Sequence, residues 1–422
     1  MTDLRGKKLL LLGGIRPTIN YVKRAQELGV HVIVTDYQVD SPAKEIADKS
    51  YLVSTTDVDA VVKLAKSLKV DGVFMAYLDS MLTYCQQVCD KLNLPFYATA
   101  EQIDIMTNKD KLKKVCTEHG LPVVKEYELT DWNNPVKMPP IQYPVVIKPV
   151  DSGGGKGIFV CVTEEELRER YPESLSFSKR KKVLVEEYMT GEQVQILYTI
   201  QDGYVSLSAM CDLYSNKQQK GFPSIPTANI YPSKHLASFK NTDHQKVVNL
   251  CKSLNIKNGV LFIQAFVHQG RVCIHEIAFR DEGGQTHKII KEMNGIDTVE
   301  MMIRHALTGE MKGYPIKDLD KPEFDMWACR LFSIGQREKI AKITGFDKIT
   351  TYPEVFDIAH HHEEGDRISQ IGTLDQVISR IFIKAETKSQ LARVIEEINT
   401  TIQVEDEKGE NMLLKPFNPY SF

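Results

Sequence analysis

The sequence lacks the features that mark membrane, secreted and nucleic-acid-binding proteins. No apolar run approaches the roughly 20 residues that a helix needs to cross a bilayer. The opening segment does not read as a signal peptide, because its apolar run, residues 9–12, ends at two glycines. The 53 basic and 56 acidic side chains give a net charge of −3, so there is no excess of positive charge to attract a nucleic acid. We therefore expect a cytoplasmic protein that binds neither membranes nor nucleic acids.

Cysteine is sparse and shows no metal-binding or disulfide pattern. The eight cysteines are scattered over 422 residues. The one close pair, Cys85 and Cys89, has the i,i+4 spacing of a helix, and no second pair completes a zinc site. This favours free thiols in a reducing compartment. At about 100–200 residues per domain, the length predicts two to four domains.

Residues 1–95 alternate between short apolar strands and helices. Strands are predicted over 8–12, 31–35 and 72–76, and helices over 18–28, 57–68 and 81–92. This alternation predicts an α/β domain with a parallel sheet. The turn after the first strand contains Gly13-Gly14 but not the G-x-G-x-x-G pattern, which favours a tight turn in a nucleotide-fold domain over a dinucleotide site.

The remainder of the chain changes character twice. Residues 96–310 mix helices with hairpins, which predicts an α+β domain, and we divide it into subdomains 96–190 and 191–310. Residues 311–422 predict a small C-terminal α+β domain. Within it, His360-His361-His362 precedes two acidic residues, and we expect a solvated loop there because three adjacent histidines cannot all face one ion.

The strongest local signal is a glycine-rich loop between two predicted strands. It consists of Ser152, Gly153, Gly154, Gly155, Lys156 and Gly157. Glycines let backbone N–H groups approach an anion closely, and the lysine adds positive charge. The loop is not a P-loop, because the spacing differs and a strand follows. A plain hairpin tip would fit this segment alone, but Lys109 and Lys148, at the ends of neighbouring elements, favour phosphate binding.

The strand 183–188 ends in residues suited to the rest of a nucleotide. An adenine could lie against its apolar end, beside Glu186, Glu187 and Met189. Glu192 or Gln193, just beyond, could hydrogen-bond ribose hydroxyls.

Taken together, these motifs resemble the ATP-grasp superfamily in order and spacing. The resemblance is carried by Asn108-Lys109, 144–148, 153–157, 185–187 and His275-Glu-Ile-Ala-Phe-Arg280. It extends to the biotin carboxylase, carbamoyl phosphate synthase, purine-biosynthesis and amino-acid ligase branches. It implies that ATP lies between two α+β subdomains under the glycine loop, with Lys109 and Lys148 on its phosphates. It also implies Mg²⁺ and a carboxylate that attacks the γ-phosphate to give an acyl phosphate.

The sequence departs from the family pattern at the expected metal ligands. By the resemblance these are Glu276 and, on the adjacent strand, Gln264, where an acid is usual; Ala278 stands where an Asn is usual. An amide can bind Mg²⁺ through oxygen but adds no charge, so the site could bind the metal more weakly than usual or could recruit Glu282. The resemblance makes Glu276 and Arg280 the catalytic candidates, because Arg280 emerges at the strand end where it can hold an acyl phosphate.

We therefore expect an ADP-forming carboxylate–amine ligase that acts on small molecules. An amino acid is one candidate for the amine. A homodimer is one option for its assembly. A purine-pathway carboxylase or formyl-transfer enzyme is the alternative suggested by Glu276-Ile-Ala278. A catalytically weak ATP-binding sensor is the alternative suggested by Gln264.

Overall fold

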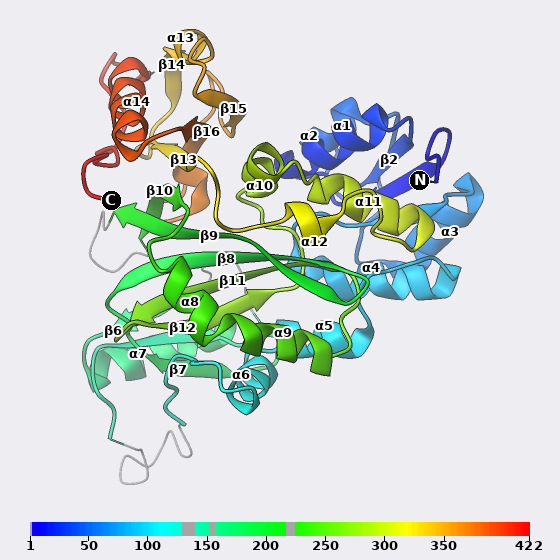
Figure 1. The fold of residues 1–422 in the computed structure, drawn as a ribbon, viewed down its shortest axis with the longest axis horizontal. Helices are drawn as coiled ribbons and strands as arrows, with labels where there is room; N and C mark the ends of the chain where they lie inside the picture. The colour runs from blue at the N-terminus through cyan, green and yellow to red at the C-terminus, as the bar shows by residue number, and fades with distance from the viewer. Residues whose placement is uncertain (1, 129–139, 152–156, 217–223) are drawn as a thin grey trace.

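The computed structural model describes residues 2–128, 140–151, 157–216 and 224–422. The N-terminal part is a parallel sheet in the order β3-β2-β1-β4 (Figure 1). Its strands are β1 (Lys8–Leu12), β2 (His31–Thr35), β3 (Lys49–Tyr51) and β4 (Gly72–Phe74), and its helices are α1 (Ile19–Glu27), α2 (Pro42–Ile46), α3 (Val58–Leu68) and α4 (Asp79–Leu92). β1 and β2 are buried after their first residue, as expected of a parallel sheet covered on both faces. The predicted nucleotide-fold sheet is confirmed.

The glycine-rich loop belongs to a small separate lobe. Its sheet has the order β6-β5-β7 and is covered by α7 (Glu164–Ser176). The strands are β5 (Val145–Pro149), β6 (Phe159–Cys161) and β7 (Val183–Glu187). This lobe, which we call the glycine-loop lobe, has its own apolar core, formed around Val145, Ile147 and Val185. Two helices, α5 (Ala100–Thr107) and α6 (Lys109–Glu118), come before it in the chain.

One antiparallel sheet dominates the rest of the molecule. Its order is β12-β11-β8-β9-β10-β13-β16-β15. The strands are β8 (Glu192–Gln201), β9 (Tyr204–Asn216), β10 (Ile225–Tyr231), β11 (Gly259–His268), β12 (Arg271–Ala278), β13 (Trp327–Ile334), β15 (Val355–His360) and β16 (Val377–Ala385). The sheet runs from the central part into the C-terminal part without a break, because β10 pairs with β13.

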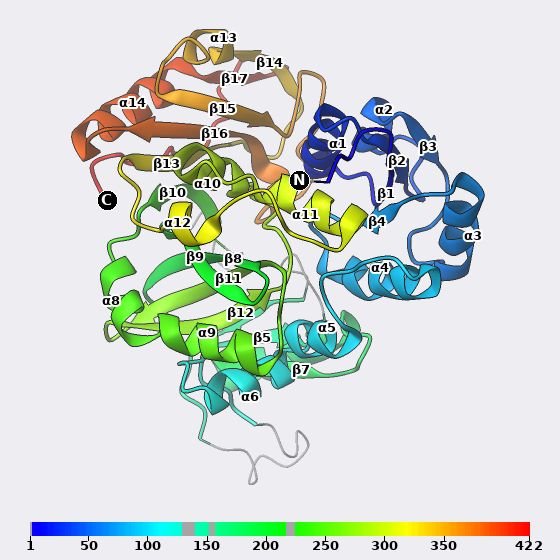
Figure 2. The same cartoon turned by 45° about the vertical axis from the view of Figure 1, so that its right-hand side comes forward.

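Helices and a second small sheet complete the fold. The central part carries α8 (Leu236–Thr242), α9 (His244–Ser253), α10 (His287–Asn294), α11 (Thr298–Thr308) and α12 (Ile316–Leu319). The C-terminal part adds α13 (Phe346–Ile349), α14 (Lys388–Thr401) and the paired strands β14 (Ile340–Thr344) and β17 (Gln403–Asp406). In Figure 2, α10 lies between the N-terminal sheet and the C-terminal part. None of the helices within the described stretches has both the length and the apolar character needed to cross a bilayer.

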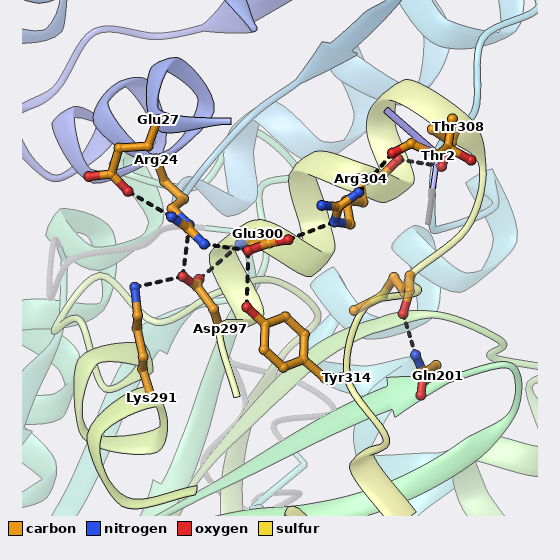
Figure 3. Close-up of polar contacts among 11 residues, drawn as sticks. Thr2, Arg24, Glu27, Gln201, Lys291, Asp297, Glu300, Arg304, Thr308 and Tyr314 are labelled. Atoms are coloured by element: carbon orange, nitrogen blue, oxygen red, sulfur yellow. Dashed lines mark hydrogen bonds and ion pairs between the residues drawn. The ribbon is translucent and has the colours of Figure 1, made fainter. Parts of the chain in front are cut away.

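The N-terminal part is tied firmly to the central part. A single apolar core extends from β1 and β4 through α11 to strands β8, β9, β11 and β12. Beside it, Arg24 of α1 forms ion pairs with two buried acids of the α11 region, Asp297 and Glu300 (Figure 3). The N-terminal sheet is therefore held in a fixed place beside the central sheet, whereas the glycine-loop lobe packs around a core of its own.

Candidate active site

The glycine-loop lobe and α6 bring three lysines around one carboxylate. Lys148 of β5 is buried, and its Nζ lies 2.6 Å from Oε2 of Glu186 on β7. Lys113 of α6 pairs with the other oxygen of Glu186. Lys109, the first residue of α6, donates to the Pro149 carbonyl at 3.2 Å. Burial, with the charge of Lys148, lowers the pKa of Lys109. The lobe therefore concentrates positive charge where the glycine loop begins.

Two of the predicted nucleotide residues, Glu186 and Glu192, already have ion-pair partners. The Glu186 carboxylate is committed to two lysines, so its side chain is not free to face an adenine. Glu192 is exposed and pairs with Lys234 and His235. Glu187, Met189 and Gln193 are half-buried near the end of β7 and the start of β8. Ser152, Gly153, Gly154, Gly155 and Lys156 lie outside the described residues, and Gly157 packs closely against Pro149 and Phe177.

The two predicted metal ligands lie side by side. Gln264 of β11 and Glu276 of β12 are register partners across an antiparallel pair, so their side chains share one face of the sheet. A β-bulge follows, which leaves His275 as the extra residue. Glu276 is close enough to both cations for its charge to oppose the lowering of the Lys109 pKa and to contribute to the raised pKa of Arg280. The carboxylate near the end of β12 therefore lies between Lys109 on one side and Arg280 on the other.

This donor set fits an ion that arrives with the nucleotide. Among the residues that the structure describes, no three His, Cys, Asp or Glu side chains are grouped to hold a metal. Mg²⁺ is usually held by one or two carboxylates together with substrate phosphates, so one carboxylate and one amide, with Lys109 near the carboxylate, suit Mg²⁺ bound to ATP. The structure is thus compatible with the predicted site and places no resident metal.

His275 is a buried histidine beside the lysines of the site, and the sequence motif alone assigns it no role. Burial, followed by the repulsion of Lys148, lowers its pKa to about 3, so the imidazole is neutral at physiological pH. Its ring lies 5.1 Å from that of Phe266. The bulge takes His275 out of the regular strand pairing. No feature of the local sequence predicts a bulge at this position.

Arg280 leaves the end of β12 and reaches the N-terminal part. Its Nη1 donates to the Asp281 carbonyl at 2.8 Å, and its Nη2 pairs with Asp79, the first residue of α4. Burial opposes the charged form, but Asp79 and Glu276 outweigh it and raise the pKa of Arg280. The guanidinium is thus a permanent cation between the metal-binding candidate Glu276 and the N-terminal sheet.

Glu282 is not available to a metal, which corrects one expectation. Its Oε2 lies 2.7 Å from Nη1 of Arg330 on β13 and accepts from Thr286 Oγ1 at 2.8 Å. Burial raises its pKa, but the attraction of Arg330 outweighs burial and holds it at about 2. A Cβ on Gly284 would lie 2.1 Å from the carboxylate and 2.2 Å from the guanidinium, so a larger residue would have to displace one of these two side chains.

A second buried arginine, Arg380, forms no ion pair with an acid among the residues that the structure describes. Arg380 of β16 is 4% exposed, its Nη1 contacts His361 Nε2, and its Nε has no partner in the described part of the chain. Burial and then the repulsion of Arg330 lower its pKa to about 10. Burial and Arg380 lower the pKa of His361 to about 3, so His361 accepts this bond as a neutral imidazole. The expectation of a solvated loop over the three histidines is therefore wrong for His361.

The N-terminal glycine turn is held by its own strand. The N–H of Gly14 donates to Asp36 Oδ2 at 2.7 Å, and a Cβ on Gly14 would lie 2.5 Å from that of Ser41. Gly13 has φ +91°, which glycine adopts without strain. These contacts support the interpretation of this segment as a tight turn.

Three comparisons with known proteins agree with this architecture. Residues 108–313 match the family model of the carbamoyl-phosphate synthase L chain ATP-binding domain. The chain is 22% identical over 325 residues to the carbamoyl phosphate synthase large chain of Clostridium beijerinckii, covering 75% of this chain but only 30% of that protein. It is 24% identical over 305 residues to the formate-dependent phosphoribosylglycinamide formyltransferase of Prochlorococcus marinus, covering 71% of this chain and 76% of the relative.

A solved structure shows the same fold over nearly the whole chain. The L-amino acid ligase from Bacillus licheniformis superposes with a TM-score of 0.77 at 17% identity, covering 96% of this chain and 99% of the ligase. The family match over residues 108–313, together with the ordered motifs within it, indicates the ATP-grasp superfamily, and the shared fold of the solved structure agrees with this.

Proposed function

We propose that this protein is an ADP-forming ligase that activates a carboxylate as an acyl phosphate and couples it to an amine. The observation that carries the proposal is a line of charges from Lys109 through Glu276 to Arg280, each acting on the next. Such a line suits phosphoryl transfer, which depends on positioning and charge neutralisation and needs no protein nucleophile.

Each part of the line has a task in this proposal. Lys109 and Lys148 hold the phosphates of ATP, and Glu276 with Gln264 holds the magnesium ion that neutralises them. Arg280 grips the acyl phosphate as a point of fixed positive charge. When bound, Mg²⁺ supplies Lewis-acid polarisation of the transferring phosphoryl group.

The carboxylate substrate has a matching cation in Arg380. An arginine that is buried without a carboxylate partner is costly, so an anionic substrate group would relieve the cost by pairing with its unpartnered Nε. Arg330, already paired with Glu282, would hold this site in shape.

The first test is nucleotide binding. The double variant Lys109→Ala, Lys148→Ala should weaken ATP binding in calorimetry tenfold or more, because charge-assisted contacts of about 1.5–3 kcal/mol each are lost. Lys182→Ala is the matched control, since Lys182 lies in the same lobe but is exposed and pairs with Asp110. Equal affinity in the double variant and the control would remove the lysine assignment.

The second test separates the alternatives. Phosphate release from ATP is measured with pooled amino acids, with formate and with bicarbonate. Release that depends on amino acids supports the ligase. Release that depends on formate or bicarbonate would favour the purine-type enzyme, an alternative supported by Ala278 and by the likeness to the formyltransferase. ATP binding without release in any pool would favour a sensor.

A further inference from the structure

We infer that Asp79 is a positioning residue of the proposed reaction: it holds Arg280 apart from Glu276, so that the Glu276 carboxylate stays available to Mg²⁺. This inference rests on the proposed function, which gives Arg280 and Glu276 their tasks. Asp79 is the first residue of α4 and lies beyond the carboxyl end of β4. Ligands of open α/β sheets bind at that edge, so the N-terminal part would contribute to the site through this residue.

The guanidinium of Arg280 is held from three sides. Its Nη2 is paired with the Asp79 carboxylate, and its Nη1 donates to the Asp281 carbonyl at 2.8 Å. Its third neighbour is Phe262, whose ring centroid lies 5.0 Å from Cζ. The side chain of Arg280 is 12% exposed and that of Asp79 is 39% exposed, so the acid reaches in from the more open side. Within the described stretches, Asp79 is the acid with which this arginine forms an ion pair.

The guanidinium and the Glu276 carboxylate lie on the same face of the β11–β12 hairpin. Phe262 and Gln264 share one face of β11, and their register partners on β12 are Ala278 and Glu276. Phe262, which Arg280 covers, is about 7 Å along the strand from Gln264. The side chain opposite Phe262 is the methyl group of Ala278, which places little bulk between the two charges.

The Asp79 carboxylate prevents these two charges from joining. Burial lowers the pKa of Arg280, and Asp79 and then Glu276 are the acids whose charges raise it. A buried arginine without an acid is costly, so without Asp79 the guanidinium would turn toward Glu276. That ion pair would occupy carboxylate oxygens that Mg²⁺ needs and would remove negative charge from the cation site. It would also take Arg280 away from the acyl phosphate.

The backbone just before Arg280 is held independently of Asp79. The hydroxyl of Tyr97, which follows α4, donates to the Phe279 carbonyl at 2.9 Å. The rings of Tyr97 and Phe279 meet edge to face with centroids 5.0 Å apart. A change at Asp79 therefore moves the side chain of Arg280 and leaves the end of β12 in place.

The first test measures binding alone. Asp79→Asn removes the charge and nearly keeps the shape. In calorimetry with a non-hydrolysable ATP analogue, its affinity without Mg²⁺ should stay within about twofold, because the lysine contacts to the phosphates are unaltered. The gain in affinity that Mg²⁺ brings should fall about threefold or more, because Glu276 is diverted from the ion.

The second test measures turnover. Hydroxylamine traps an acyl phosphate as a hydroxamate, with ATP, Mg²⁺ and each of the protein amino acids or formate supplied in turn as the carboxylate. Asp79→Asn should need about threefold more Mg²⁺, or above, to reach half its maximal rate. That maximal rate should fall about tenfold or more, since misplacing a positioned group by about 1 Å can cost about 100-fold.

Two variants serve as controls. Asp79→Glu keeps the carboxylate and should lose less in both tests than Asp79→Asn. Asp59→Asn removes an exposed acid that pairs with Lys91 near the other end of α4, and both tests should give the values of the unaltered protein.

An unchanged effect of Mg²⁺ in Asp79→Asn would overturn the inference, whatever happens to the rate. Equal losses of metal-free binding and of rate would also overturn it, because they would show that the ion pair only fastens the N-terminal part. Absence of hydroxamate from the unaltered protein with every one of these carboxylates would instead overturn the proposed function itself.

Discussion

In the proposed site, Gln264 and Glu276 would set the charge that Mg²⁺ meets at the strand end. As register partners, they would be two adjacent carboxylates in a Gln264→Glu variant. We expect this variant to reach half-maximal ATP turnover at a lower Mg²⁺ concentration, because added ligand charge strengthens cation binding. Glu276→Gln should abolish turnover. A Mg²⁺ titration of phosphate release measures both.

The control for this prediction is Gln269→Glu. It adds the same charge to the exposed turn of the same hairpin, away from the strand end, and should leave the Mg²⁺ requirement unchanged. An active Glu276→Gln variant, together with an unaltered Mg²⁺ requirement in Gln264→Glu, would show that the ion binds elsewhere.

The two glycines after Glu282 should respond very differently to alanine. In Gly284→Ala the new methyl group would have to displace either the Glu282 carboxylate or the Arg330 guanidinium. Separating a buried ion pair costs about 3–5 kcal/mol, so we expect a loss of that order in the free energy of unfolding, measured in urea. In Gly283→Ala the nearest atom is Tyr77 Cβ at 4.0 Å, so the loss should be below about 1 kcal/mol. Similar losses in the two variants would contradict this explanation.

Some site residues could be predicted from the sequence and others could not. Lys109 and Lys148 could be singled out because they lie at the ends of elements that the sequence shows, whereas Glu276 and Arg280 came from the resemblance to the ATP-grasp superfamily. Arg330 reaches Glu282 across 48 positions of sequence. Such a contact depends on which strands pair, and one sequence does not contain that information.

Among the elements, α1 and α11 are joined by charge as well as by apolar packing. Arg24 Nε lies 2.9 Å from Asp297 Oδ2, and Glu300 also accepts from Arg304 at 2.7 Å (Figure 3). The side chains of Asp297 and Glu300 are 5% and 8% exposed. Removing Arg24 would therefore leave two buried carboxylates with one cationic partner fewer. Arg24→Ala should lower the free energy of unfolding by about 1.5–3 kcal/mol.

Glu27→Gln tests the same arginine from its solvent side. The Glu27 carboxylate is 60% exposed, and an exposed i,i+3 pair is worth about 0.5 kcal/mol or less. Urea unfolding of both variants provides the measurement. A loss in Glu27→Gln as large as that in Arg24→Ala would mean that α1 itself, and not its contact with α11, has been weakened.

The elements of the N-terminal part were the most predictable. The strands predicted over 8–12 and 31–35 have those bounds, because each is a short apolar run closed by glycine or aspartate. The continuity of the large sheet was not predictable. Ala228 of β10 faces Leu331 of β13, about a hundred residues later, with α8 to α12 between them. Local patterns identify both strands but cannot show that they are neighbours.

For the molecule as a whole, buried neutral histidines predict sensitivity to mild acid. Burial is the main cause that lowers the pKa of His275 and His361 to about 3 and that of His305 to about 4, from 6.5. Below pH 6.5 these histidines bind protons in the unfolded chain but stay neutral in the folded protein. Their contribution to the free energy of unfolding is therefore fully present above pH 6.5 and declines as the pH falls toward 4. Each histidine contributes up to about 1.4 kcal/mol per pH unit.

His305 offers the clearest measurement because it lies in α11, away from the proposed site. His305→Gln should make the free energy of unfolding less dependent on pH between 6.5 and 4 by up to one proton, whatever its effect on stability at pH 8. His268→Gln, at an exposed position, should keep the original dependence. An unchanged slope in His305→Gln would show that this histidine does not resist protonation in the fold.

The uninterrupted large sheet determines how the protein can be cut for expression. A fragment that stops before Trp327 would leave β10 as an edge strand, with unpaired N–H and C=O groups facing water. Ala228 and Ile230 would also lose the apolar cover that β13 and α14 now provide. Such a fragment carries a template on which the β10 strands of other copies can align, so it should accumulate in inclusion bodies although every residue of the proposed ATP site is present.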